Sequence, residues 1–405
     1  MNEISLYFHI PFCRRRCGYC DFNTFAGLDS FIPKYVDSIC QETQDVLQSA
    51  PIPFNVHTIY FGGGTPSLLS INHYTQIFST ISTNSEVKAD AEISLEANPE
   101  TVTQTYIHKL REIGFTRISF GMQSASPEDL RVLDRQHRYG SVVEAVQWSK
   151  QAGFSNINLD LIFGIPGQSR ESWQHTLALA LGFNIDHFSI YSLIVEEGTR
   201  LKRWIERGII SAPDDDLGAE MYEDAMDILA NAGYEQYEIS NWCRTAESRC
   251  RHNLQYWRFL PYLGIGAGAH GFYGNTRTEN RGGVVEYIQS IANRRGGNFP
   301  AGAAAKKVTV LSEWDKILEN MMVSLRLTEE GISLSEFTTR HKLSMLDLFK
   351  GQIERLLHSG LIEFVAGNDR MRLTRKGRLF GNRVFSEFVG NEVPRGFEYL
   401  ADQKT

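Results

Sequence analysis

The chain has 405 residues, of which 42% are hydrophobic and 22% are charged, and its formal net charge is -7. This composition is typical of a globular protein, and the length predicts one large domain with one or two smaller units. A negative net charge without a clustered Lys/Arg surface excludes nucleic acid as the expected partner. The sequence shows no secretory signal pattern and no apolar run long enough to span a bilayer, so we expect a cytoplasmic protein without a transmembrane segment.

Short β-rich runs alternate with helical patterns along the first half of the chain. The predicted strands are 4–10, 56–61, 91–97, 116–121, 156–164 and 186–193. The predicted helices are 31–48, 71–82, 102–113, 127–135, 140–153 and 170–182. Six strand–helix steps indicate an α/β protein with a parallel sheet, either a partial TIM-type barrel or an open doubly wound sheet. The alternation alone does not choose between these two.

The pattern changes after residue 195. A helix is expected near 216–232, and the Gly/Ala-rich stretch 296–305 has the composition of a linker. Beyond it, three helices are predicted at 311–325, 333–340 and 345–358. They precede a predicted two-stranded wing in the segment GLIEFVAGNDRMRLT. This order predicts a winged-helix-like module, which we expect to be a scaffold because it lacks a basic recognition helix. We therefore divide the chain into 1–195, 196–305 and 306–405.

Three of the six cysteines, Cys13, Cys17 and Cys20, lie within eight positions directly after the first predicted strand. Three thiolates on one short loop can each bind one iron of a cubane and leave the fourth iron open. The rival is zinc with His9 as the fourth ligand, although structural zinc sites usually pair two separated ligand pairs. We expect an iron–sulfur cluster here and expect Cys40 and Cys243 to be buried structural thiols.

Further candidates follow at the ends of later strands. Glycines 62–64 of F-G-G-G-T-P can let the backbone approach a ligand closely, although without the neighbouring cysteine loop a plain tight turn is the favoured explanation. Glu96, Gln123 and Asp160 each interrupt an apolar run where catalytic groups of a barrel gather. The alternative is a satisfied polar layer inside the barrel. Arg135, twelve positions after Gln123, is a candidate charge partner.

The run R-C-R-H-N-L-Q-Y-W contains a histidine among aromatic residues. Imidazole is a common axial ligand of haem iron, and flat rings suit the face of a porphyrin. A core histidine is the plain alternative for His252, and Cys250 is an alternative thiolate ligand.

The sequence Y-F-H-I-P-F-C-R-R-R-C-G-Y-C resembles the C-x3-C-x2-C loop of radical S-adenosylmethionine (SAM) enzymes. Its flanks resemble the branch that contains the oxygen-independent coproporphyrinogen III oxidases and their relatives, the haem chaperones. The resemblance continues through G-G-G-T-P, H-N-x-x-Y-W and the C-terminal module. It implies a partial (β/α)6 barrel, one [4Fe–4S] cluster on the three cysteines, and SAM on the open iron. The SAM contacts that it implies are Tyr7, Tyr19, Gly63, Gly64, Thr65, Glu96, Gln123, Arg135, Asp160 and Ile194.

Two functions fit this resemblance. A haem chaperone would bind haem through His252, Asn253, Tyr256 and Trp257 and transfer it to an acceptor protein. A radical enzyme would oxidatively decarboxylate a porphyrinogen, and a donor such as flavodoxin or ferredoxin would supply electrons. H-N-x-x-Y-W is typical of the chaperone branch, whereas the oxidase has a fourth cysteine at the position of Phe22 and a longer N-terminal arm. We therefore expect a haem chaperone, and whether SAM is cleaved stays open.

Overall fold

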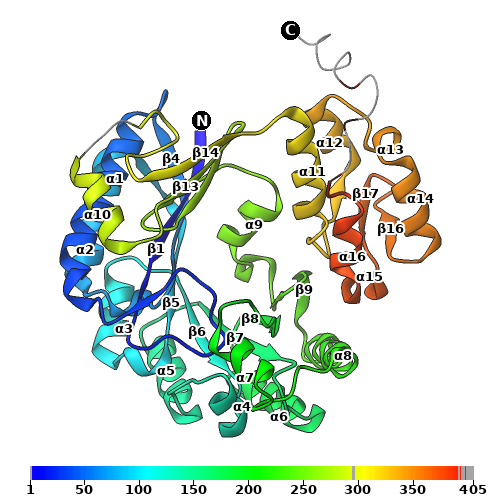
Figure 1. The fold of residues 1–405 in the computed structure, drawn as a ribbon, viewed down its shortest axis with the longest axis horizontal. Coiled ribbons are helices and arrows are strands. Elements are labelled where there is room, and N and C mark those ends of the chain that lie inside the picture. The colour runs from blue at the N-terminus through cyan, green and yellow to red at the C-terminus, as the bar shows by residue number, and fades with distance from the viewer. Residues whose placement is uncertain (1, 294–296, 391–392, 394–396, 398–405) are drawn as a thin grey trace.

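The computed structural model describes residues 2–293, 297–390, 393 and 397. Its centre is a run of six parallel strands, which confirms the predicted alternation and the partial barrel (Figure 1). Each strand is followed by helices that return the chain to the start of the next strand. The strands are β1 (Asn2–Ile10), β4 (Phe54–Gly63), β5 (Glu86–Ala97), β6 (Arg117–Gln123), β7 (Asn156–Phe163) and β8 (His187–Ser192).

Helices pack on the outer face of these strands, and several begin at a Ser or Thr cap. Ser70, Thr103, Ser126 and Ser169 each accept a hydrogen bond from a backbone N–H of the first turn, which satisfies one of the free donors of a helix start. The helices are α1 (Ile32–Gln48), α2 (Ile71–Asn84), α3 (Gln104–Glu112), α4 (Pro127–Val132), α5 (Tyr139–Gln151) and α6 (Arg170–Gly182).

Both edges of the barrel are extended by later strands, so the barrel stays open on one side. On one edge, β11 (Tyr262–Ile265) runs parallel to β1 and is followed by antiparallel β12 (His270–Tyr273), β13 (Thr276–Asn280) and β14 (Ala305–Val310). On the other edge, β10 (Asn241–Cys243) and β9 (Glu235–Glu238) follow β8. The remaining helices of this part are α7 (Arg200–Glu206), α8 (Asp215–Asn231), α9 (Arg251–Trp257) and α10 (Val284–Asn293).

The two faces of the barrel strands differ in chemistry. Leu6 and Phe8 of β1 belong to the apolar core under the helices. Ser5 alternates with them and lies inside the barrel, where it hydrogen-bonds to Thr58 of β4. Successive strand residues point to opposite faces, so this alternation lines the inside of the barrel with polar groups. Such groups are costly to bury unless they are paired, which makes the inside the place to look for a site.

Residues from Trp314 onward form a second core and a separate module. The predicted two-stranded wing is joined by a short third strand, and the three strands form one separate antiparallel sheet. Because β14 pairs with β13, residues 306–310 belong to the main sheet. The elements are α11 (Glu313–Ser324), β15 (Ile332–Ser333), α12 (Leu334–His341), α13 (Met345–Leu348), α14 (Lys350–His358), β16 (Ile362–Val365), β17 (Arg370–Leu373), α15 (Arg375–Leu379) and α16 (Gly381–Ser386). Within the described residues, no helix combines the length and the apolar character needed to cross a membrane.

Candidate cluster and ligand site

The cysteine loop leaves the barrel through the short strand β2 (Phe12–Cys13), which pairs with β3 (Phe25–Ala26). All three cysteines border one cavity of about 420 Å³ at the C-terminal ends of the strands, which we call the cluster cavity. The middle of the loop is fixed by backbone hydrogen bonds from Gly18 N–H to Leu133 and from Leu201 N–H to Gly18. The side of the loop is fixed by Asp134, whose carboxylate bridges Arg15 and Arg200 at 2.6 Å each.

The three thiols suit a cubane better than a single ion. Thr65 Oγ1 lies 3.5 Å from Cys13 Sγ, an Arg135 nitrogen 3.5 Å from Cys17 Sγ, and Thr24 Oγ1 3.9 Å from Cys20 Sγ. Among the described residues, no three Cys, His, Asp or Glu side chains converge on one metal position. A cubane does not require such convergence, because each thiolate binds a different iron.

The zinc alternative depends on His9, and its ring is committed elsewhere. Its Nε2 donates to the Asn23 carbonyl at 2.9 Å, and its Nδ1 accepts from the Tyr7 hydroxyl at 3.0 Å. A neutral imidazole has one donor and one acceptor, so no ring nitrogen is left to complete a zinc site. The donor set therefore fits an iron–sulfur cluster.

The glycine run after β4 allows a close backbone approach. Gly63 has φ +110°, and a Cβ added there would lie 2.4 Å from the His9 ring. At Gly64, an added Cβ would lie 2.7 Å from the Phe12 carbonyl oxygen. The glycines thus let the backbone at the end of β4 lie close to β1 and the cysteine loop. The Gly63 N–H donates to Glu96 Oε2 at 3.0 Å.

Four carboxylate residues line the cluster cavity, and two of them, Glu96 and Asp160, belong to barrel strands. Glu96 accepts a second hydrogen bond from Tyr60 at 2.8 Å, and Asp160 accepts from Ser119 at 3.0 Å and Asn158 at 2.8 Å. Burial, assisted by the charge of Asp160, raises the pKa of Glu96 to about 7, and burial also raises the pKa of Asp160. A bound cation would relieve this cost, and the sulfonium group of SAM carries a positive charge.

All predicted SAM contacts except Tyr7 line the cluster cavity. Arg135 donates to Asn98 at 2.8 Å and to the Gly121 carbonyl at 2.9 Å, and its Nε has no partner among the described residues. Gln123 has φ 63°, a left-handed conformation that side chains rarely adopt outside functional or tightly constrained sites. These residues line the cluster cavity together with Tyr19, Gly63, Gly64, Thr65, Glu96, Asp160 and Ile194. Tyr7 lines a different cavity.

The second cavity has a volume of about 650 Å³, and we call it the aromatic cavity. It shares Asp21, Phe22, Gly63 and Glu96 with the cluster cavity, so the two are neighbours. Its walls carry a set of aromatic rings from Tyr7, Tyr256, Trp257, Phe259, Tyr262 and Phe272. The Trp257 Nε1 atom is buried away from this cavity and has no hydrogen-bond partner among the described residues, so Trp257 contributes the face and edge of its ring to the wall.

Helix α9 carries H-N-x-x-Y-W and contacts both cavities. Asn253 lines the cluster cavity, whereas Tyr256 and Trp257 line the aromatic cavity. His252 is buried between them: its Nδ1 lies 2.8 Å from Thr58 Oγ1, and its Nε2 lies 2.8 Å from the Tyr256 hydroxyl. The motif residues are therefore brought together, but they face different spaces.

Cys250, the alternative thiolate, lines neither cavity. Its buried Sγ lies 3.7 Å from Glu92 Oε1, and burial together with the Glu92 charge raises the pKa of the thiol to about 12. A thiol held protonated at neutral pH is a poor metal ligand.

Several residues of these cavities were not predicted from the sequence. Tyr60, Arg117 and Asn158 face the cluster cavity from inside the barrel, and strict alternation along their strands was the available signal. Asn98 lies two positions after Glu96. His270 faces the aromatic cavity from β12, and its glycine- and alanine-rich surroundings give no periodic pattern.

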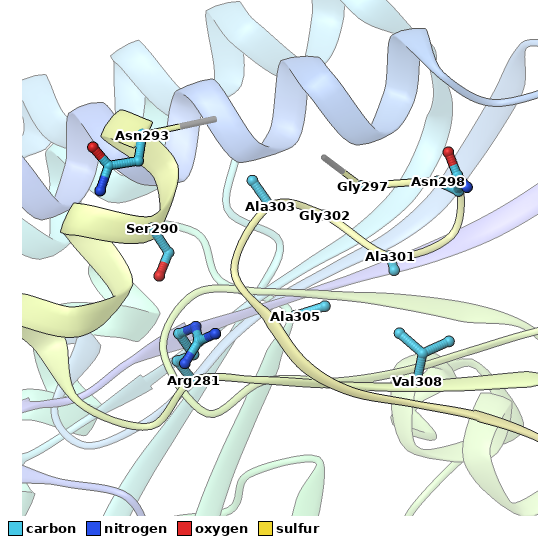
Figure 2. A pocket seen from close by; sticks show the side chains of 10 residues that line it. All are labelled: Arg281, Ser290, Asn293, Gly297, Asn298, Ala301, Gly302, Ala303, Ala305 and Val308. Atoms are coloured by element: carbon cyan, nitrogen blue, oxygen red, sulfur yellow. The ribbon is translucent and has the colours of Figure 1, made fainter. Parts of the chain in front are cut away.

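A third cavity, of about 690 Å³, lies between α10 and the segment leading to β14 (Figure 2). It is lined by small and polar residues and by Arg281, and it shares no lining residue with the other two cavities. None of the described residues that line it has a thiol or an aromatic ring, so it offers neither cluster ligands nor stacking surfaces.

Comparison with known proteins places this geometry in a family. The chain matches the Radical SAM superfamily over residues 7–180 and the HemN C-terminal domain over residues 311–380. It is 36% identical over 387 residues to the protein named Heme chaperone HemW of Bacillus subtilis, covering 95% of this chain and 99% of that protein. The chain belongs to the HemW family of radical SAM proteins. The HemW protein of Mycobacterium tuberculosis H37Rv is 37% identical over 393 residues, covering 96% of this chain and 95% of that protein.

A solved structure supports the fold of this HemW family member. Coproporphyrinogen III oxidase (HemN) from Escherichia coli superposes with a TM-score of 0.83 at 23% identity, covering 96% of this chain and 90% of that chain. The match extends through both the barrel and the C-terminal module, so the two proteins share one architecture. Membership in the radical SAM superfamily implies a [4Fe–4S] cluster and SAM.

Proposed function

We propose that this protein is a cytoplasmic haem chaperone that binds haem and transfers it to an acceptor protein. It holds one [4Fe–4S] cluster on Cys13, Cys17 and Cys20 and binds SAM in the cluster cavity. An electron donor such as flavodoxin or ferredoxin would reduce the cluster. The haem occupies the aromatic cavity beside H-N-x-x-Y-W. This assignment is supported by the names of the HemW relatives.

One observation carries the haem assignment. The motif helix α9 forms part of the wall of an aromatic cavity that directly adjoins the cluster cavity. Its volume lies within the range of about 300–1,000 Å³ that is usual for small-molecule and cofactor pockets. Its aromatic walls suit a large flat ring, and Arg277 and His270 add polar groups to its lining.

The residues of the cluster cavity have separate tasks. SAM on a reduced cluster supplies radical chemistry when it is bound. Glu96 and Asp160 provide negative charge, while Gly63 and Gly64 let the end of β4 lie close to β1 and the cysteine loop. Phe22 is 63% exposed and borders both cavities, where the oxidase branch would offer a thiol. The presence of Phe22 in place of that cysteine favours haem binding and transfer over decarboxylation of a porphyrinogen.

A haem titration of anaerobically purified protein tests the proposal. We expect a Soret band that saturates at one haem per chain, and weaker binding in Trp257→Leu. Phe380→Leu is the control, because this exposed ring lies outside the aromatic cavity. Iron and sulfide content shows whether each variant is folded.

The same preparation, reduced and loaded with SAM, should not convert coproporphyrinogen III into protoporphyrinogen IX. Decarboxylation over many turnovers would replace the chaperone assignment with the oxidase assignment. Absence of a Soret band in the wild-type protein would reject haem binding.

A further inference from the structure

We infer that His270, rather than His252 of the H-N-x-x-Y-W motif, ligates the haem iron in the aromatic cavity. This inference rests on the haem-binding function proposed above and names the iron ligand of that site. It follows from the hydrogen bonds of the histidines near the cavity and from their positions on the strands and on α9.

His252 is committed to the protein interior. Its side chain is only 1% exposed, and its ring stacks on Tyr60 with centroids 5.0 Å apart. The Thr58 hydroxyl donates its proton to Ser5 at 2.6 Å, so the Thr58 oxygen accepts a hydrogen bond from His252 Nδ1. With the proton on Nδ1, His252 Nε2 accepts from the Tyr256 hydroxyl. Both nitrogens of the neutral ring are therefore used, and burial lowers the pKa of His252 to about 3. Iron ligation would break one of these hydrogen bonds and open the stack.

His9 also borders the aromatic cavity, but it is committed in the same way. Its two ring nitrogens bond to Tyr7 and to the Asn23 carbonyl. Moving this ring would also disturb Gly63, against which it packs. Ligation by His9 would therefore disrupt the wall shared with the cluster cavity.

His270 differs in each respect. It lies at the start of β12, it is exposed, and it borders the aromatic cavity. Within the described part of the chain, no group hydrogen-bonds to its ring, so a nitrogen is available. Imidazole with a free nitrogen is a common protein ligand of haem iron.

The backbone presents this imidazole from a fixed position. His270 and Phe272 are two apart on β12, so both side chains point to the same face of the strand. Both residues border the aromatic cavity, and their backbone partners on β13 are Glu279 and Arg277. At Gly264 of β11, an added Cβ would lie 2.0 Å from the His270 carbonyl oxygen, so the glycine lets the strands approach closely. A ligand held on a paired strand is more precisely placed than one on a loop.

The test is a titration with ferric haem, followed by absorption and resonance Raman spectroscopy. In wild-type protein we expect a histidine-ligated Soret spectrum. His270→Ala should lose this signature and bind haem about tenfold or more weakly, because the coordinate bond is removed. Added imidazole should restore the ligated spectrum by entering the space of the deleted ring. Retained iron and sulfide would show that the variant is folded.

Two comparison variants make the result decisive. His358→Ala removes an exposed histidine of α14 that borders neither cavity, and it should bind like wild type. His252→Gln should keep the histidine-ligated spectrum even if its affinity falls. Retention of that spectrum in His270→Ala would overturn the inference and leave haem binding itself intact. Failure of the wild-type protein to bind haem would reject the inference together with the proposed function.

Discussion

Replacing Glu96 with Gln should stabilise the protein without cofactors and weaken SAM binding at the same time. Burial and the nearby Asp160 raise the pKa of Glu96 from 4.5 to about 7. Glutamine keeps the shape of the side chain: its oxygen can accept from Gly63, and its amide can donate to the Tyr60 hydroxyl oxygen. The substitution therefore removes the charge while it preserves the local hydrogen bonds.

The pH dependence of this effect has a definite sign. Between pH 4.5 and about 7, folded Glu96 holds a proton that the unfolded chain has already released. The free energy of unfolding therefore falls as the pH rises through this window. Above about pH 7, a pKa shift of this size lowers it by at most about 3 kcal/mol. Glu96→Gln lacks this penalty. Its melting temperature should equal that of wild type at pH 5 and exceed it by about 3–4 °C at pH 8 if the chain unfolds as one unit.

SAM binding should change in the opposite direction. Loss of a carboxylate that faces a cation should weaken SAM about tenfold or more, measured as the SAM-induced change in the EPR spectrum of the reduced cluster. Glu100→Gln is the control, since this exposed carboxylate borders neither cavity. Equal melting temperatures of wild type and Glu96→Gln at pH 8 would refute the electrostatic reasoning. Unchanged SAM affinity would refute the placement of SAM beside Glu96.

Two further substitutions test the cluster and the core. Cys17→Ser should abolish the [4Fe–4S] cluster, measured as iron and acid-labile sulfide. The control Cys40→Ser on α1 should keep the cluster. Stoichiometric zinc without acid-labile sulfide in the wild-type protein would contradict the cluster assignment. Glu42→Gln should lower the free energy of unfolding at pH 5 by about 1–3 kcal/mol. Gly266, Asn280 and Tyr287 all hydrogen-bond to this carboxyl group, whose two oxygens can both accept, whereas the amide nitrogen of Gln cannot accept a hydrogen bond. At pH 8 the loss should be smaller, since burial raises the pKa of Glu42 to about 7 and wild type then also carries the cost of a buried charge. Equal unfolding curves at pH 5 would contradict this account.

The barrel could be predicted from the sequence because its signals are local. The six parallel strands were found as apolar runs between helical patterns, and the observed ends differ by only a few residues. The edge strands β11 to β14 were missed. They are short and interrupted by Gly264, Gly266, Gly268 and Gly271, so neither alternation nor β-propensity is clear there.

The site was only partly predictable, because it depends on contacts between distant segments. The cysteine spacing predicts cluster ligands without knowledge of the fold. The role of Glu96, by contrast, depends on Gly63 and Tyr60 of the preceding strand. The division into a cluster cavity and an aromatic cavity arises from tertiary packing. No single segment reveals it, and for this reason Tyr7 could not be separated from the other predicted SAM contacts.

The spacing within H-N-x-x-Y-W follows from the task of α9. A helix of seven residues is too short to be stable alone, so it must be anchored by the barrel. Glu92 of β5 accepts hydrogen bonds from the backbone N–H groups of Arg251 at 2.9 Å and His252 at 3.1 Å, which fixes the start of the helix inside the barrel. Residues four apart lie on the same face of a helix, so His252 can hold the Tyr256 hydroxyl.

This arrangement gives the motif histidine a positioning role. Thr58 fixes one side of the His252 ring, and the other side fixes Tyr256 in the wall of the aromatic cavity. Asn253, the next residue, points to a different side of the helix and borders the cluster cavity. One short helix therefore contributes to the walls of both cavities, and the order of the motif residues follows from the helical periodicity.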